Sequence, residues 1–225
     1  MERFICLALG YVFGLFQTAF IYGKAHGIDI REYGSGNSGT TNALRVLGKK
    51  AGAIVLLGDC AKCILAVVVT RLLFGGSHPE TIWLLCLYSA AGAILGHNFP
   101  FYMGFKGGKG IAATAGLILS FHPYFIPVGV VVFFGIFFLT HYVSLGSLLV
   151  YAAFMIEMVV CGQLGVFGEA TSQATLYEMY AVAAFLTIMA YWKHRENIVR
   201  LLHGQERKTY LTKKNKLDVE NKNEQ

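Results

Sequence analysis

The sequence predicts an all-α membrane protein with seven transmembrane helices, its N-terminus outside and its C-terminus in the cytoplasm. Apolar residues make up 55% of the 225 residues and charged residues only 14%. The charges avoid several long segments, which excludes an ordinary soluble core. The basic residues instead gather between and after those segments, where membrane topology places them.

Seven apolar segments are long enough, or nearly long enough, to cross a bilayer as helices, which takes about 20 residues. They lie near residues 3–22, 51–73, 80–96, 111–121, 124–140, 144–162 and 175–192. The fourth is too short for a full span, so the loop before it extends it or it is a half-span. The first has no clearly basic leader or small-residue cleavage site, and we interpret it as an uncleaved spanning helix.

The distribution of basic residues decides between six and seven spans. If residues 111–140 formed one bent span, the basic C-terminal region would lie opposite the basic loop at 23–50. If the turn at Phe121-His122-Pro123 separates two spans, both regions and the loop after Gly96 share one side. That side then holds 16 of the 19 Lys and Arg residues, as the positive-inside rule favours. We expect one membrane domain over residues 1–208 and a polar, mobile cytoplasmic tail over 209–225.

Several classes of function are disfavoured. The net charge of +6 does not indicate nucleic-acid binding, because no platform of basic and aromatic residues is present. Cys60-x-x-Cys63 has redox or metal spacing, but without a second pair or a histidine we interpret both as buried free thiols. His194 and His203 are too far apart to be adjacent helical metal ligands. We therefore expect neither a metal nor a cofactor.

A polar stretch follows the first apolar segment. It runs Tyr33-Gly34-Ser35-Gly36-Asn37-Ser38-Gly39-Thr40-Thr41-Asn42-Ala43-Leu44-Arg45. Its closely spaced glycines favour unusual backbone angles. Thr41 or Asn42 is placed to cap a helix over residues 43–47. A helix N-terminus with hydroxyls and Arg45 suits an anionic ligand rich in oxygen, although an ordinary polar loop is the alternative.

The stretch from Gly96 to Thr114 contains a second set of glycines, in Phe105-Lys106-Gly107-Gly108-Lys109-Gly110. It offers backbone N–H donors between two cations, which are the requirements of a phosphate cradle. It is not a Walker A loop, because a glycine follows Lys109 where Mg²⁺ would need a hydroxyl, and this argues against an ATPase. The alternative is a flexible loop whose lysines only follow the positive-inside rule.

Charged and polar residues also occur inside or just after the apolar segments. Asp59 and Lys62 lie three residues apart in the second segment, so they share one helix face and we expect a structural ion pair. His97 is interpreted as a packing or hydrogen-bonding residue at a helix end. After the last segment, a continued helix would bring His194, Arg195 and Asn197 together. The alternative there is a basic helix that lies on anionic lipid.

Three signatures together resemble those of the bacterial membrane glycerol-3-phosphate acyltransferases that use acyl phosphate. They are Ser35-Gly36-Asn37-x-Gly39-x-Thr41-Asn42-x-x-Arg45, Gly96-His97-x-x-Pro100 with Phe105-Lys106-Gly107-Gly108-Lys109-Gly110, and His194-Arg195-x-Asn197-Ile198-x-Arg200-Leu201-x-x-Gly204-x-Glu206. The Asp59 and Lys62 pair also fits, and the resemblance covers about residues 3–208. Ser38 and Thr40 depart from the family pattern, which often has an aliphatic residue and an alanine there.

The resemblance implies transfer of a fatty acyl group from acyl phosphate to the 1-hydroxyl of sn-glycerol 3-phosphate, giving lysophosphatidic acid and phosphate in phospholipid synthesis. It implies a multi-pass protein of the bacterial cytoplasmic (inner) membrane, with its active site at the cytoplasmic face. The expected catalytic residues are Ser35, Arg45, Lys106, His194 and Asn197. The expected substrate and phosphate ligands are Asn37, Thr41, Asn42, Gly107, Gly108, Lys109, Gly110 and Arg195. Asp59, Lys62, His97 and Glu206 are expected to be structural.

Individual roles follow from the same resemblance. Lys106 and the amides of residues 107–110 would hold a phosphate, while Arg45 and Lys109 screen charge. Ser35 and Asn37 would orient the attacking hydroxyl or the acyl carbonyl, and the third signature would bind glycerol phosphate. His194 or a substrate phosphate would accept the proton. The alternative function is a membrane transporter for an organic phosphate, because glycine loops at broken helices also suit that class.

Overall fold

The structure is a computed structural model that describes residues 1–211, and this part of the chain contains only helices and their connections. The α-helices are α1 (Glu2–Gly14), α2 (Thr18–Ala25), α3 (Thr40–Leu47), α4 (Lys49–Phe74), α5 (Ile82–Asn98), α6 (Ile111–Phe121), α7 (Phe125–Thr140), α8 (Val143–Gln163), α9 (Gln173–Lys193) and α10 (Arg195–Leu202). Short 3-10 helices lie at Ile30–Glu32 and Phe101–Met103. The all-α prediction is therefore confirmed over the described range.

Five helical segments of the described chain are long and apolar enough to cross a membrane. They are Glu2–Ala25, Lys49–Phe74, Ile82–Met103, Val143–Gln163 and Gln173–Lys193. Each coincides with an expected span, and the protein is an integral membrane protein. The helices α6 and α7 are also apolar but shorter, with 11 and 16 residues, so length alone does not show that they cross separately.

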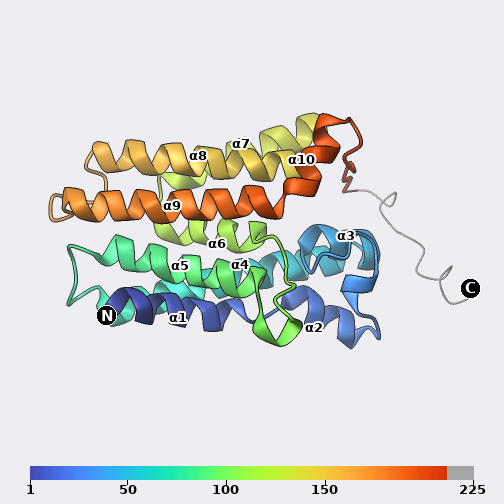
Figure 1. The fold of residues 1–225 in the computed structure, drawn as a ribbon, viewed down its shortest axis with the longest axis horizontal. Helices are drawn as coiled ribbons and strands as arrows, with labels where there is room; N and C mark the ends of the chain where they lie inside the picture. The colour runs from blue at the N-terminus through green and yellow to red at the C-terminus, as the bar shows by residue number, and fades with distance from the viewer. Residues whose placement is uncertain (212–225) are drawn as a thin grey trace, which may run out of the picture.

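The turn between α6 and α7 lies at the expected place and reverses the chain. At the end of α6, the carbonyl of Phe121 accepts a hydrogen bond from Arg71, near the C-terminal end of α4. At the end of α7, the carbonyl of His141 accepts from the backbone of Thr209 beyond α10. The two helices thus run in opposite directions between the two ends of the bundle (Figure 1).

The first span differs from the expected continuous helix. It breaks over residues 15–17, and α2 begins at Thr18. The break releases the backbone carbonyl of Phe16, which accepts a hydrogen bond from the Lys62 ammonium group at 2.7 Å. The buried amide of Gln17 also lies at this point and donates to the carbonyls of Gly14 and His97. A polar partner inside the bundle satisfies the freed carbonyl, as the lipid environment requires.

Close packing of α1 against α5 holds the N-terminal helix in the bundle. A Cβ atom on Gly92 would lie 2.1 Å from the carbonyl oxygen of Leu7, and one on Gly96 would lie 2.3 Å from that of Tyr11. Small residues let the two backbones approach in this way. On the other side, α6 lies between α4, α5 and α7. The loop before α3 and the glycine loop before α6 lie at one end of the bundle, together with α3 and α10 (Figure 1).

Candidate active site

One pocket of about 670 Å³ lies at the end of the bundle that carries α3 and α10. All three polar stretches noted in the sequence contribute to it. The expected site residues in its lining are Ser35, Asn37, Thr41, Asn42, Arg45, Asp59, His97, Lys106, Gly107, Lys109, Gly110, His194, Arg195, Asn197 and Glu206. Gly108 and Lys62 lie behind this lining.

The first polar stretch is shaped by Asn42. Its side-chain oxygen accepts from the amide of Ser35 at 2.9 Å, and its amide nitrogen donates to the carbonyls of Ile30 and Tyr33 at 3.1 and 3.0 Å. Asn42 is buried. Although it was expected to bind substrate, its polar atoms are committed to the loop, and it presents Ser35 to the pocket.

The helix after this loop starts earlier than expected. Its first residue is Thr40, its N-cap is Gly39, and no side-chain cap bond is formed. The expectation that Thr41 or Asn42 caps it is therefore wrong, because the asparagine side chain turns back into the loop. Thr41 instead lies in the first turn of α3, and Arg45 lies in its last turn, with both side chains at the pocket.

The glycine loop wraps around the C-terminal end of α5. The amide of Gly107 donates to the carbonyl of Asn98 at 3.2 Å, and that of Gly108 donates to the carbonyl of His97 at 3.1 Å. Because those two N–H groups already donate within the protein, only the amides of Lys109 and Gly110 remain of the amides at 107–110 that were expected to hold phosphate. Neither of these donates a hydrogen bond to any residue in the range 1–211. Gly110, with φ +85°, is the N-cap of α6.

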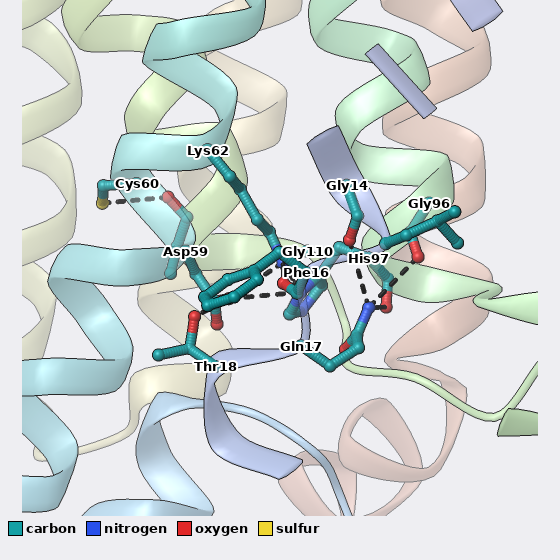
Figure 2. Close-up of polar contacts among 12 residues, drawn as sticks. Gly14, Phe16, Gln17, Thr18, Asp59, Cys60, Lys62, Gly96, His97 and Gly110 are labelled. Carbon is teal, nitrogen blue, oxygen red and sulfur yellow. Dashed lines mark hydrogen bonds and ion pairs between the residues drawn. The ribbon is translucent and has the colours of Figure 1, made fainter. Parts of the chain in front are cut away.

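A buried polar network supports the glycine loop from behind, and Figure 2 shows it between α4, the α1–α2 break and α5. Lys62 forms an ion pair with Asp59 at 2.9 Å and shares a hydrogen bond with His97 Nδ1 at 2.8 Å. Thr18 donates to the same Asp59 oxygen, Oδ1, at 3.0 Å. The ring of His97 lies against Gly108, where a Cβ atom would come within 2.0 Å of Nε2. The network thus sets the position of the loop.

Helix α10 is tied to the glycine loop by a chain of hydrogen bonds. The ammonium group of Lys109 donates to the side-chain oxygen of Asn197. The amide nitrogen of Asn197 donates to Glu206 at 2.8 Å, and Arg200 donates to the other carboxylate oxygen at 2.9 Å. Burial lowers the pKa of Lys109. Lys109 therefore joins two of the polar stretches, and the Glu206 carboxylate is placed to brace the third.

His194 lies where the chain breaks between α9 and α10. Its Nδ1 atom is 2.8 Å from the carbonyl of Ala190, so Nδ1 carries the proton and donates this bond. The Nε2 atom can then act as an acceptor, it has no hydrogen-bond partner within residues 1–211, and His194 lines the pocket. Burial, aided by Lys109 and Lys193, lowers the pKa of His194 to about 4. The imidazole is consequently neutral at physiological pH and can accept a proton.

The pocket is lined by both cations and apolar side chains. Its cations are Arg45, Lys106, Lys109, Lys193, Arg195, Arg200 and Arg207. Its apolar lining is Leu56, Phe99, Phe105, Ile111, Ala112, Phe133, Val143 and Trp192. Anionic oxygens suit the cations, and an alkyl chain suits the apolar side chains. The pocket is thus built for an amphiphile with a phosphate-like head.

Comparison with known proteins places the chain in a family. The profile described as "Glycerol-3-phosphate acyltransferase" matches residues 4–204. A glycerol-3-phosphate acyltransferase of Bacillus cytotoxicus is 37% identical over 215 residues, covering 95% of this chain and 98% of the relative. One from Clostridioides difficile is 38% identical over 206 residues, covering 91% and 94%. The chain belongs to the glycerol-3-phosphate acyltransferase family.

The fold agrees with this family. A crystal structure of PlsY, an integral membrane glycerol 3-phosphate acyltransferase, in its glycerol 3-phosphate form has a TM-score of 0.76 and 30% identity, covering 93% of this chain and 96% of that chain. The lysophosphatidic acid form of PlsY has a TM-score of 0.77 and 28% identity, covering 94% and 97%. The resemblance inferred from the three signatures is therefore confirmed at the level of family and fold.

Several pocket residues of this family member escaped the sequence analysis. Ser144 and Ser147 lie in the first turns of α8, and Phe133 lies on α7. They sit in apolar segments that carry no motif, so only the packing of α7 and α8 beside α6 brings them to the pocket. Gln17 lies outside the pocket and is fully buried at the α1–α2 break. The sequence did give a signal for it, because a glutamine inside an apolar segment needs a hydrogen-bond partner.

The cysteines and the acidic residues suggest no metal centre. Cys60 donates to the carbonyl of Ala112 at 3.0 Å, and all five cysteines are free and buried. Within residues 1–211, no group of three or more His, Cys, Asp or Glu side chains is arranged to hold a metal ion.

Proposed function

We propose that this family member transfers a fatty acyl group from acyl phosphate to the 1-hydroxyl of sn-glycerol 3-phosphate, giving lysophosphatidic acid and phosphate. The observation that carries the proposal is a pocket whose lining combines several cations with apolar side chains. PlsY, a relative of the same fold, has been solved in glycerol 3-phosphate and lysophosphatidic acid forms. Those molecules are the proposed acceptor and product.

The chemistry needs little more than positioning and charge screening, because acyl phosphate is an activated mixed anhydride. The hydroxyl oxygen of glycerol 3-phosphate attacks the acyl carbonyl carbon, a new ester C–O bond forms, and the bond to the phosphate oxygen breaks. Phosphate leaves with the electron pair of that bond. The hydroxyl proton passes to Nε2 of His194 or to a phosphate oxygen of a substrate.

Each side chain has a role that its position supports. Lys106, exposed at the mouth of the pocket, and the free amides of Lys109 and Gly110 hold a phosphate group. Arg45 neutralises charge across the pocket. Ser35 and Asn37 orient the attacking hydroxyl or the acyl carbonyl. The acyl chain lies against apolar side chains of the lining, close to Phe133 and the start of α8.

His194, Asn197 and Arg195 of the third stretch bind glycerol phosphate in this scheme. The side-chain oxygen of Asn197 accepts a hydrogen bond from the Lys109 ammonium group, and its amide nitrogen donates to Glu206. Arg195 lies over the ring of Trp192, 4.8 Å from its centroid. The predicted domain covers residues 1–208, but Thr209 and Tyr210 of the predicted tail also pack against His141 at the end of α7. Residues 212–225 of that tail lie outside the described residues.

We also propose that α1 with α2, α4, α5, α6, α7, α8 and α9 form seven crossings of the bacterial cytoplasmic membrane. The opposite directions of α6 and α7 support two separate crossings there. The end with the pocket carries most of the basic residues and would face the cytoplasm. Both anionic substrates would then reach the pocket from the cytoplasm.

The direct test uses the purified protein in lipid with palmitoyl phosphate and labelled glycerol 3-phosphate. Equal amounts of phosphate and lysophosphatidic acid are expected, with no product from acyl-CoA or acyl-carrier protein. Product from a thioester donor alone would contradict the proposed donor. No product with any donor, from folded protein, would contradict the whole scheme.

Variants test the residues in the same assay. Arg45→Ala or Lys106→Ala is expected to lower kcat/KM by at least about a hundredfold, because each removes a charge that holds substrate phosphate both in the bound complex and in the transition state. Lys50→Ala is the matched control, since Lys50 is exposed at the start of α4 and outside the pocket lining. Near-normal turnover by either pocket variant would reject its proposed role.

A further inference from the structure

A short segment after α10 crosses the end of the bundle, and we name residues 205–211 the C-terminal strap. The backbone amide of Thr209 donates to the carbonyl of His141 at 2.8 Å, where α7 ends. The ring of Tyr210 lies on that of His141, with 4.7 Å between centroids. Arg207 donates to the carbonyl of Gly34 in the first polar loop at 3.4 Å. The strap thus connects α10, α7 and the loop before α3.

The strap also holds the guanidinium group of Arg45. Nη2 of Arg45 donates to the hydroxyl oxygen of Thr209 at 2.6 Å and to the carbonyl of Arg207 at 3.3 Å. An arginine Nη2 atom carries two hydrogens, so the strap takes both. Within residues 1–211, Nε and Nη1 of Arg45 donate to no other group, so their three hydrogens remain for an anion in the pocket, which Arg45 lines.

Burial and the surrounding charges distinguish the contact between Thr209 and Arg45 from a hydrogen bond at the protein surface. Thr209 is only 1% exposed, so its hydroxyl is shielded from competing water. Burial, aided by the like charges of Arg207 and Arg200 and opposed by Glu206, lowers the pKa of Arg45. A long cationic side chain that is repelled by its neighbours needs a fixed acceptor to keep one position.

We propose that Thr209 is a positioning residue, which holds Arg45 in the orientation that receives a substrate phosphate. The role rests on the proposed acyl transfer. The family match ends at residue 204 and the third signature ends at Glu206, so Thr209 lies outside both. Thr209 acts through Arg45, and its hydroxyl need not touch either substrate.

The test compares Thr209→Val, which keeps the shape and loses the acceptor, with Thr209→Ser, which keeps the acceptor. The rate is measured while acyl phosphate and glycerol 3-phosphate are varied separately. For Thr209→Val we expect the KM of one of the two to rise about tenfold, as for loss of a hydrogen bond to a charged group, with kcat within about twofold. Thr209→Ser is expected to restore that KM to within about twofold of the wild-type value.

Thr171→Val is the matched control, since the hydroxyl of Thr171 donates to the carbonyl of Phe167 and both lie between α8 and α9, away from the pocket. An unchanged KM in Thr209→Val would overturn the proposal. So would a lower KM, which would show that the strap competes with substrate. A fall in kcat and in the thermal midpoint without a change in KM would mean a structural role only. An inactive wild-type protein would overturn the acyl transfer and this role together.

Discussion

His194 has a fixed tautomer and a pKa shifted by its surroundings, and both matter for its proposed chemistry. The carbonyl of Ala190 receives the Nδ1 proton. Burial and the cations Lys109 and Lys193 lower the pKa to about 4, against smaller opposite effects of the hydrogen bond to Ala190 and of Glu206. At neutral pH the Nε2 lone pair is therefore available as an acceptor. A protonated imidazole would instead repel the lysines beside it.

We expect the resonance of His194 in ¹³C-labelled histidine to stay that of the neutral imidazole from pH 8 down to about pH 5. The measurement is an NMR titration in detergent, with His194→Asn to assign the signal. In the unfolded chain His194 binds a proton below about pH 6.5, but in the fold only near pH 4. His194 therefore lowers the free energy of unfolding as the pH falls from about 6.5 to about 4. A midpoint near 6.5 would contradict this environment.

At the scale of elements, the glycine loop is shaped by contact with α5 as much as by its own sequence. A Cβ atom on Gly108 would lie 2.0 Å from Nε2 of His97 and 2.8 Å from the carbonyl of Ser38. The His97 ring cannot move away freely, since Lys62 holds its Nδ1 atom. Glycine at this position allows the loop, the first polar stretch and α5 to meet.

Gly108→Ala is therefore expected to lower acyl transfer by at least about tenfold, because the added methyl group displaces His97 or the loop that carries Lys109 and Gly110. Initial rates in the acyl phosphate assay are the measurement. Gly135→Ala is the control, since a Cβ atom there meets nothing within 4 Å. Equal rates for both variants would show that the close contact does not position the loop.

The contact between α1 and α5 makes a prediction about stability. Gly92→Ala places a methyl group against the carbonyl of Leu7, 2.1 Å away before any adjustment. Overpacking of this kind costs about 1–3 kcal/mol, and we expect a lower thermal midpoint in detergent. Gly135→Ala is again the comparison. An unchanged thermal midpoint for Gly92→Ala would mean that α1 can shift without loss of stability, and that its close packing does not stabilise the bundle.

At the scale of the whole molecule, the two ends of the bundle differ in charge. The end with α3 and α10 carries the cationic pocket. The opposite end has a smaller charged cluster, in which Arg3 of α1 binds Glu178 of α9 at 2.6 Å and Tyr88 of α5 donates to the same carboxylate at 2.9 Å. This asymmetry makes the proposed orientation testable.

Single cysteines report that orientation, because the native cysteines are buried. Ser77 lies exposed in the connection from α4 to α5, and Lys50 lies exposed at the pocket end. With a maleimide that cannot cross the membrane, intact cells are expected to label Ser77→Cys but not Lys50→Cys. Permeabilised cells should label both. The reverse pattern in intact cells would reject a cytoplasmic pocket.

The sequence by itself determined the helical class, the positions of the apolar segments and the three polar stretches. These features are local, since hydropathy, helix-ending residues and motif spacing can be read along the chain. The short α6 was predicted in this way, and the turn after Phe121 was predicted from the distribution of basic residues along the chain. The family followed as well, because Ser35, Lys106, Asn197 and their neighbours stand in a recognisable order.

Tertiary structure alone decided which polar groups remain free for a ligand. The amides of Gly107 and Gly108 turn to α5, and the side chain of Asn42 turns into its own loop. The break at Gln17 and the contact from Thr209 to Arg45 likewise join segments far apart in the chain. The physical reason is that buried polar groups must find partners, and those partners are known only when the helices have packed.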